Sequence, residues 1–227
     1  MVVASIVNGV PFWGITFNKS IKPLSSPKEL AGYSVATFPS PSTAYTLQEE
    51  MFKEGGLKPD IRQGAFGTII AMLKAGQADI GLELEPNVSQ AVKDGAHVVY
   101  SLSKIYGNFA ITGLTTTPQV IAKHPNLVQA VVCSIQEALN FIRSNPDSSL
   151  KILQNRFPEV SPQVAQAALS RVISDGIIPA SCVTDSTAWS NAVQLRIHAG
   201  DIKHAAAMGD YVDNTFADEA LKTCGKK

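Results

Sequence analysis

A polar turn between an apolar run and a helical pattern is the part of the chain best suited to bind a small molecule. Ser40, Ser42 and Thr43 lie in this turn, after an expected strand at 33–38 and before an expected helix at 43–55. The first N–H groups of a helix have no partner within the helix, and the helix dipole adds positive charge there. Such a turn can hold a carboxylate, sulfonate or phosphate without a basic side chain. The alternative is that Ser42 or Thr43 only caps its own helix.

The cysteines and histidines form no pattern typical of catalysis or metal binding. Cys133, Cys182 and Cys224 are far apart and lack the spacing of a metal site. Cys133 lies in an apolar helical pattern, which predicts a buried and unreactive thiol. One disulfide could form, but the sequence does not determine it. The four histidines are scattered, so we expect no catalytic residue, no metal site and no cofactor.

The composition excludes two broad classes of function. The chain has 227 residues, with 19 basic and 19 acidic side chains, and 45% of its residues are hydrophobic. A net charge of zero argues against a nucleic-acid-binding surface, which needs a basic patch or stripe. No apolar run approaches the roughly 18–20 residues that span a bilayer. The length allows one large domain or two small ones.

The order of the expected elements divides the chain into two parts. Strands and helices alternate from residue 24 to about residue 102, which predicts a parallel sheet with helices on its faces. The expected strands are at 33–38, 59–64, 78–84 and 97–102, and the helices between them at 27–31, 43–55, 66–76 and 86–94. Extended runs at 8–17 and 106–115 are expected to cross between the two parts. Later helices are expected at 125–144, 148–156, 161–173 and 184–199.

Three passages resemble those of a known protein family. They are PLSSPKELAGYSVATFPSPSTAY at 23–45, KAGQADIGLELEPNVSQAVKDGAHVV at 74–99 and IAKHPNLVQAVVCSIQEALNFIRSNPDSSLKIL at 121–153. In order and spacing they resemble type 2 periplasmic solute-binding proteins, most closely the NMT1/THI5-like group. That group includes the alkanesulfonate, taurine, nitrate and thiamine-precursor binding components of ABC importers.

The resemblance implies an α/β fold with two lobes, like that of type 2 periplasmic binding proteins. A parallel-dominated sheet would form a complete lobe at 18–105, and residues 1–17 and 106–227 would form a helix-rich partial second lobe. Members of the group begin with further βα units that carry a signal peptide or lipid anchor. The expectation is that this chain lacks that segment.

The resemblance also implies where the ligand is held. The implied contacts are Asn8, Phe12, Trp13, Ser40, Ser42, Thr43, residues 63–66 including Gly64 and Phe66, Glu83 and Glu85. The alternatives are that Phe12 and Trp13 pack in the hinge, and that the two glutamates only precede a helix. A carboxylate at Glu83 repels an anion and attracts an amine or aminopyrimidine. Without a nearby bidentate arginine, a small organic solute of mixed polar and aromatic character is favoured over nitrate or sulfate.

The implied function is that of the substrate-binding component of an ABC importer, which captures a small organic solute between two lobes. Its partners would be the permease and ATPase subunits, and its location periplasmic or otherwise extracytoplasmic. It would meet the membrane only through the transporter or a missing N-terminal anchor. Two alternatives stay open: an enzyme on the same fold, of the thiamine-pyrimidine, desulfinase or menaquinone-pathway type, and a ligand sensor without transport. The cysteine-rich motif of the fungal thiamine-pyrimidine synthases is absent from this sequence.

Overall fold

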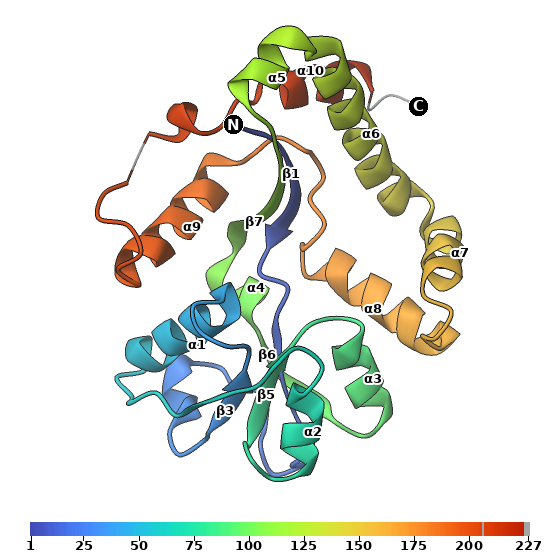
Figure 1. Ribbon diagram of the computed structural model, residues 1–227. Helices are drawn as coiled ribbons and strands as arrows, with labels where there is room; N and C mark the ends of the chain where they lie inside the picture. The colour runs from blue at the N-terminus through green and yellow to red at the C-terminus, as the bar shows by residue number, and fades with distance from the viewer. Residues whose placement is uncertain (206, 225–227) are drawn as a thin grey trace. The chain divides into compact units, whose positions relative to one another are not determined.

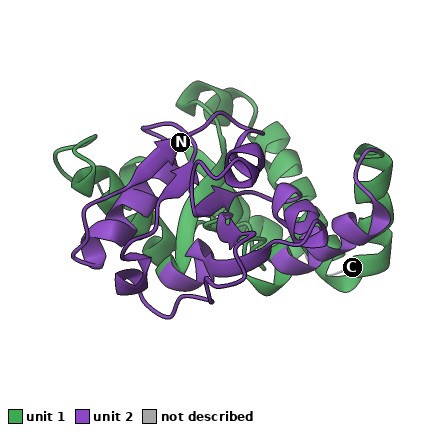
Figure 2. Cartoon of the chain, turned by 90° about the horizontal axis from the view of Figure 1, so that it is seen from below, with its two compact units in different colours: residues 1–10, 106–158, 172–227 green, residues 11–105, 159–171 purple. Residues whose placement is uncertain are grey.

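The computed structural model describes residues 1–205 and 207–224, which form two compact units. Unit 1 contains residues 1–10, 106–158 and 172–227, and unit 2 contains residues 11–105 and 159–171. Figure 1 shows the order of the elements, and Figure 2 colours the two units. Each unit is therefore built from segments that are distant in the sequence. No helix in the described part of the chain is long and apolar enough to cross a membrane.

Unit 2 is built around a five-stranded sheet in the order β4-β3-β5-β2-β6. Its strands are β2 (Trp13–Thr16), β3 (Val35–Thr37), β4 (Ile61–Gln63), β5 (Ile80–Glu83) and β6 (His97–Ser101). The helices between them are η1 (Pro27–Leu30), α1 (Thr43–Glu54), α2 (Ile69–Lys74), α3 (Asn87–Lys93) and α4 (Leu102–Tyr106). Helix α8 (Pro162–Ser174) begins in this unit and ends in unit 1.

Strand β2 is the antiparallel member of this sheet. Strands β3, β4 and β5 are parallel neighbours, and β2 runs antiparallel to both β5 and β6. Four strands therefore point in one direction, as expected for a parallel-dominated sheet. The extended run expected at 8–17 passes from unit 1 to unit 2 between residues 10 and 11. Its later part, β2, was not expected to be an inner strand of the sheet with partners on both sides.

The two faces of this sheet are covered by different helices. A Cβ added at Gly14 would lie 2.3 Å from the ring of Tyr100, whose hydroxyl donates to Gln48 Oε1 on α1 at 2.7 Å. A Cβ added at Gly81 would meet Ile69 and Leu73 of α2 at 2.8 Å. Because side chains alternate between faces along a strand, α1 covers one face and α2 covers the other. Both glycines are needed because neighbouring side chains fill the space of a Cβ.

Unit 1 has a two-stranded antiparallel sheet and most of the helices. The strands are β1 (Val2–Gly9) and β7 (Asn108–Thr115). The helices are α5 (Pro118–Lys123), α6 (Pro125–Ser144), α7 (Pro146–Arg156), α9 (Ser186–His198), η2 (Met208–Asp210) and α10 (Thr215–Thr223). Apolar side chains from β1, α6 and α10 meet in one core together with Cys182. Its buried members are Val3, Ala4, Val128, Val132, Leu139, Cys182, Ala217 and Ala220.

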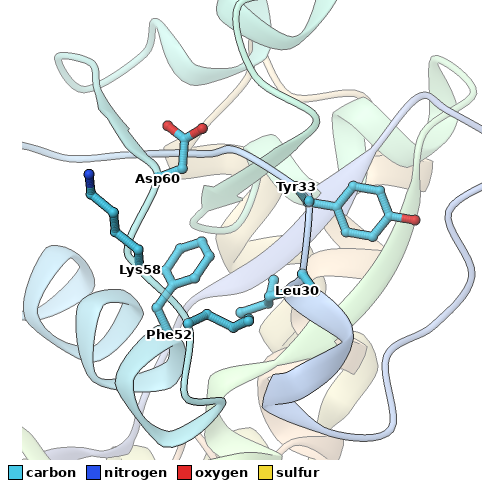
Figure 3. A pocket seen from close by; sticks show the side chains of 8 residues that line it. Leu30, Tyr33, Phe52, Lys58 and Asp60 are labelled. Atoms are coloured by element: carbon cyan, nitrogen blue, oxygen red, sulfur yellow. The ribbon is translucent and has the colours of Figure 1, made fainter.

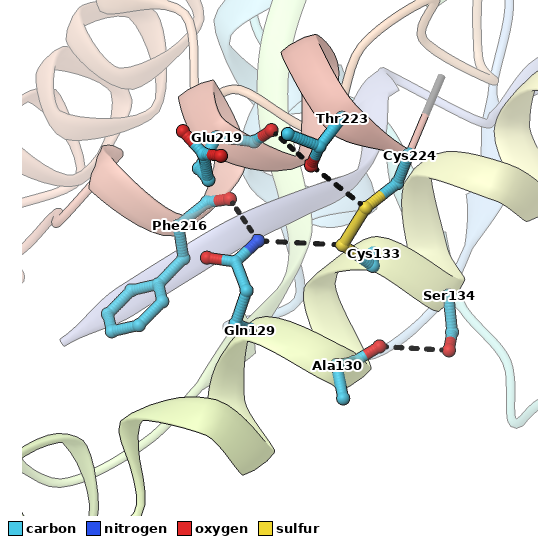
Figure 4. Close-up of a disulfide and its surroundings, with 8 residues drawn as sticks. All are labelled: Gln129, Ala130, Cys133, Ser134, Phe216, Glu219, Thr223 and Cys224. Atoms are coloured by element: carbon cyan, nitrogen blue, oxygen red, sulfur yellow. Dashed lines mark hydrogen bonds between the residues drawn. A yellow bond between two sulfur atoms is a disulfide. The ribbon is translucent and has the colours of Figure 1, made fainter. Parts of the chain in front are cut away.

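A disulfide joins Cys133 of α6 to Cys224, the residue after α10, and so links these two helices of unit 1 (Figure 4). Their Cα atoms are 5.5 Å apart, an ordinary disulfide separation. Gln129 Nε2 adds a second link between these helices by donating to the carbonyl of Phe216 at 3.1 Å. The expectation of an unreactive thiol at Cys133 was wrong. The bond joins residues 91 positions apart, which helical periodicity cannot reveal.

Most of the expected elements are present, with three differences. Helix α6 has the expected bounds at 125–144, and the expected strands of unit 2 are each shorter by one to three residues. The sequence analysis did not expect α4, α5, η2 or α10. The two units also differ in extent from the expected ones, because residues 11–17 and 159–171 belong to the same unit as 18–105. The pairing of β2 with β5 and β6 accounts for the first of these two segments.

Candidate functional site

Most of the predicted site residues lie at one edge of the unit 2 sheet. This edge, called here the C-terminal edge, contains the last residues of β3, β4, β5 and β6 and the first residue of β2. The strand registers establish it, since Trp13 is paired with both Glu83 and Ser101, and Thr37 with Gln63. Ligands of open α/β sheets bind at the carboxyl ends of parallel strands. The C-terminal edge is therefore our candidate binding site.

The polar turn after β3 forms the N-terminal cap of α1. Ser42 Oγ accepts a hydrogen bond from the backbone N–H of Tyr45 at 3.2 Å, so the capping interpretation of Ser42 is confirmed. The turn is also tied to β4, because the backbone N–H of Ser40 donates to Gln63 Oε1 at 3.1 Å. Ser40 is exposed, and Ser42 and Thr43 are partly exposed. The twelve residues of α1 add a dipole whose positive end lies at this turn.

Glu83, the last residue of β5, is buried at the same edge with an exposed fraction of 1%. Its Oε1 accepts a hydrogen bond from the backbone N–H of Leu84 at 2.8 Å, and its Oε2 has no partner within the described residues. Burial raises the pKa of Glu83, against smaller lowering effects of hydrogen bonds from Leu84 and Asn87. Glu83 was expected to contact a ligand, and the structure places its side chain almost wholly inside unit 2. It is a buried acid, and one of its two carboxyl oxygens has no hydrogen-bond donor among the described residues.

An aromatic group lies beside Glu83. Trp13 is paired with Glu83 across the strands and is likewise only 1% exposed. Phe38 follows β3 and stacks on Phe66 with ring centroids 4.1 Å apart, while Phe12 is tilted against it at 6.0 Å. Phe66 is 70% exposed, so this Phe12–Phe38–Phe66 stack runs from the core to the surface. Phe38, its central member, was not among the predicted site residues.

Gly64 positions the loop that carries Phe66. Its backbone N–H donates to the carbonyl of Thr37 at 2.9 Å, which extends the pairing of β3 and β4 by one residue. A Cβ at Gly64 would lie 2.5 Å from Met72 Sδ of α2. The role of Gly64 is thus to let α2 approach the strand end closely. Side-chain bulk at this position would displace α2 or the loop.

A second buried polar group lies under α1, on the face of the sheet opposite to Glu83. Tyr100, Gln48 and Thr37 are all buried, and Gln48 Nε2 and Thr37 Oγ1 find no partner in the described structure. Burial raises the pKa of Tyr100, which keeps its hydroxyl as a proton donor. These residues carry no recognisable sequence signal, because β6 and α1 meet only in the folded unit.

Two further predicted residues are not among the strand-end residues of unit 2 that define the C-terminal edge. Glu85 forms an ion pair with Arg171 of α8, and its Oε1 also accepts from Ser89 Oγ at 2.9 Å. The expectation that Glu85 contacts a ligand therefore gives way to a structural role in holding α8 to α3. Asn8 lies in unit 1, near the end of β1, where its Oδ1 is buried without a partner among the described residues. Its backbone N–H donates to the carbonyl of Ile177 at 3.1 Å.

A pocket of about 280 Å³ lies at the opposite edge of the sheet (Figure 3). Tyr33 precedes β3 and Asp60 precedes β4, so this pocket opens at the amino ends of the strands. Leu30 and Phe52 form its apolar part, and Lys58 and Asp60 contribute its charges. Its position is the reverse of that expected for a ligand site in an open α/β sheet. We therefore assign it no part in the candidate site.

The described residues include no cluster of histidine, cysteine or acidic side chains that could hold a metal ion. The free thiol, Cys182, is fully buried, and burial is the main cause that raises its pKa to about 11. A thiol with this pKa is almost wholly protonated at neutral pH and is a poor nucleophile.

Comparison with known proteins identifies the fold. No curated protein matches the chain. The ligand-binding component of an ABC-type import system from Staphylococcus aureus aligns with a TM-score of 0.73 and 16% identity, over 96% of this chain and 74% of that one. A putative periplasmic sulfonate-binding protein from Methylobacillus flagellatus aligns with a TM-score of 0.74 and 15% identity, over 98% and 68%. The desulfurization enzyme DSZB aligns with a TM-score of 0.70 and 12% identity, over 97% and 78%.

These likenesses show that the chain has the fold of periplasmic solute-binding proteins. The family described as NMT1/THI5 like matches residues 1–149, which is more than half of the chain. The three passages that carry the resemblance begin within this range, and the C-terminal edge is included in it. The chain belongs to the NMT1/THI5-like family.

Proposed function

We propose that this chain is the substrate-binding component of an ABC importer and that it captures a small organic solute at the C-terminal edge of unit 2. The observation that carries this proposal is the convergence of the capped N-terminus of α1, the buried acid Glu83 and the Phe12–Phe38–Phe66 stack on one sheet edge. Binding sites for small molecules combine apolar walls with a few placed polar groups in this way. Solved structures of the same fold are named as a ligand-binding component of an ABC-type import system and as a periplasmic sulfonate-binding protein of a putative ABC transporter.

An extracytoplasmic location is part of the proposal. The Cys133–Cys224 disulfide supports it, because disulfides persist in oxidising compartments and are rare in the cytosol. The proposed partners are a permease and an ATPase, and a genomic neighbourhood that encodes both would support them. A gene context without any transporter subunit would favour a sensor instead.

An enzyme is the second candidate, favoured by the structural likeness to the desulfurization enzyme DSZB. The cysteines weaken this candidate, since Cys182 is buried with a raised pKa and Cys133 and Cys224 are bonded to each other. The acid Glu83 has no nucleophile or base bonded to it in the described structure. A binding protein needs neither a reactive thiol nor a nucleophile or base beside Glu83, so a binding role fits the site better than catalysis.

A ligand screen by thermal shift tests the proposed function. We expect a member of one of three classes, small sulfonates, aminopyrimidines or aromatic acids, to raise the melting temperature. Binding at a concentration about 100 times Kd stabilises the native state by about 2.7 kcal/mol. The absence of any shift across all three classes at millimolar concentration would contradict the proposal.

Ser42→Asp locates the site of any anionic compound that binds. Aspartate is as good an N-cap as serine, so α1 should keep its cap while a negative charge faces the ligand. We expect the Kd of an anionic ligand to rise at least about tenfold, the equivalent of roughly 1.4 kcal/mol. The matched control is Asp185→Ser, the reverse exchange at the N-cap of α9, where Asp185 Oδ1 accepts from the Ala188 N–H at 2.8 Å. Unchanged affinity in the Ser42 variant would place the anion elsewhere.

A further inference from the structure

The unpartnered oxygen of Glu83 calls for a hydrogen-bond donor. Buried polar atoms without hydrogen-bond partners are uncommon in folded proteins and lower their stability. Oε2 of Glu83 is such an atom, in a side chain whose other oxygen already accepts from the Leu84 N–H. Since a ligand that supplies an N–H or O–H group would remove this loss of stability, Glu83 is suited to contact the solute directly.

The charges around Glu83 favour a cationic donor. The neighbouring acid, Glu85, is neutralised by Arg171. Among the described residues, the groups that hydrogen-bond the carboxyl group of Glu83 are the Leu84 N–H and the side chain of Asn87, both uncharged, and no basic side chain pairs with it. A protonated nitrogen would donate a hydrogen bond to the buried carboxylate and would also neutralise its negative charge. A sulfonate or carboxylate at the same position would meet like charge.

The aromatic stack supports the same choice of ligand. Ala36 is paired with Gly81, so Phe38 continues β3 beside Glu83 on the same face of the sheet. Aromatic faces attract cations and stack on flat rings. The outer ring, Phe66, lies between Gly64 and Gly67, and Gly67 has a φ of +83° that favours glycine. The ring of Phe66 is 70% exposed, so it is the part of the stack that a solute can reach from the surface.

We propose that Glu83 determines the specificity of this site and selects a solute with a protonated nitrogen, such as an amine, amidine or aminopyrimidine. The nitrogen donates to Glu83 Oε2, and the remainder of the solute packs against the Phe38–Phe66 stack. This inference rests on the proposed function, because it assigns a ligand class to the same site. It leaves the N-terminus of α1 to bind a second, anionic end where the solute has one.

Two matched probe pairs test the inference by calorimetry or thermal shift. Benzamidine and benzamide share one shape and differ in charge, and taurine and isethionate differ in an ammonium against a hydroxyl group. We expect the parent protein to bind the cationic member of each pair at least about tenfold more tightly, as expected for a charge-assisted hydrogen bond. Glu83→Gln keeps the shape and the acceptor for Leu84 but removes the charge, and should abolish the difference within each pair.

Phe66→Leu provides a second variant that does not depend on the folding of the first. It should weaken benzamidine by about threefold to tenfold, the worth of one aromatic contact, and leave taurine nearly unchanged. Equal binding of both members of a pair to the parent, or an unchanged preference in Glu83→Gln, would overturn the inference. Failure of all four probes would overturn it as well. The proposed function survives these results if other sulfonates or aromatic acids bind, and fails only if nothing in the wider screen binds.

Discussion

Removal of the Cys133–Cys224 disulfide should destabilise unit 1 and leave unit 2 unchanged. The bond holds α10 against α6 at the end of a loop of 91 residues. The perturbation is the double substitution Cys133→Ala and Cys224→Ala, which removes the bond without leaving a reactive thiol. Ala217 and Ala220 of α10 remain buried against the core. Helix α10 should therefore stay packed on α6, but the free energy of unfolding of unit 1 should be smaller.

The size of the effect follows from the length of the closed loop. Loop-closure entropy for 91 residues amounts to about 15.5 cal/mol/K, or about 4.6 kcal/mol at 25 °C. Measured values for single disulfides fall typically at about 2–4 kcal/mol, because the unfolded chain keeps some structure. We therefore expect the free energy of unfolding of unit 1 to fall by about 2 to 4.6 kcal/mol.

The two tryptophans allow the units to be followed separately. Trp13 belongs to unit 2 and Trp189 to unit 1. In a Trp13→Phe background, the urea transition of Trp189 fluorescence reports unit 1, and its midpoint should fall in the disulfide variant. In a Trp189→Phe background, Trp13 reports unit 2 and serves as the control, with no change expected.

Thiol counting provides the result that would refute this reasoning. The chain has three cysteines, so the unreduced and unfolded protein should show one reactive thiol, that of Cys182. Three reactive thiols, or a bond that includes Cys182, would show that the pairing is wrong. A Trp189 transition that does not move in the double variant would show that the bond does not stabilise unit 1.

Two further predictions concern unit 2. Gly14→Ala would place a Cβ 2.3 Å from a buried tyrosine ring and should lower the free energy of unfolding of unit 2, followed by Trp13, by about 1–3 kcal/mol. The control is Gly209→Ala in unit 1, which has open space around it and should change the urea transition of Trp189 by no more than about 0.5 kcal/mol. Burial raises the pKa of Glu83 above 4.5 in the folded state, so the folded protein keeps a proton that the unfolded chain releases. The free energy of unfolding should therefore fall as pH rises from 4.5 through the folded pKa, and then level off. Glu83→Gln should lack this fall, and parallel pH profiles for parent and variant would contradict the prediction.

The sequence alone determined the local elements, because their signals lie within a few residues of each other. Apolar side chains at helical spacing and Pro125 at the start predict α6 at its observed bounds. The turn before α1 is predicted in the same way, since an N-cap contacts a backbone group three residues away. The order of strands and helices also sufficed to place the polar turn and Glu83 after strands of one sheet.

Only the tertiary structure decided what those residues contact. A four-residue strand such as β2 looks the same in sequence whether it crosses between units or pairs inside a sheet, and its pairing with Glu83 depends on residues 70 positions apart (13 and 83). The Cys133–Cys224 bond and the Glu85–Arg171 ion pair join residues 91 and 86 positions apart. Burial of Glu83 likewise results from neighbours supplied by several strands. Local pattern determines the secondary structure, but long-range packing determines which polar groups are satisfied and which remain to bind a ligand.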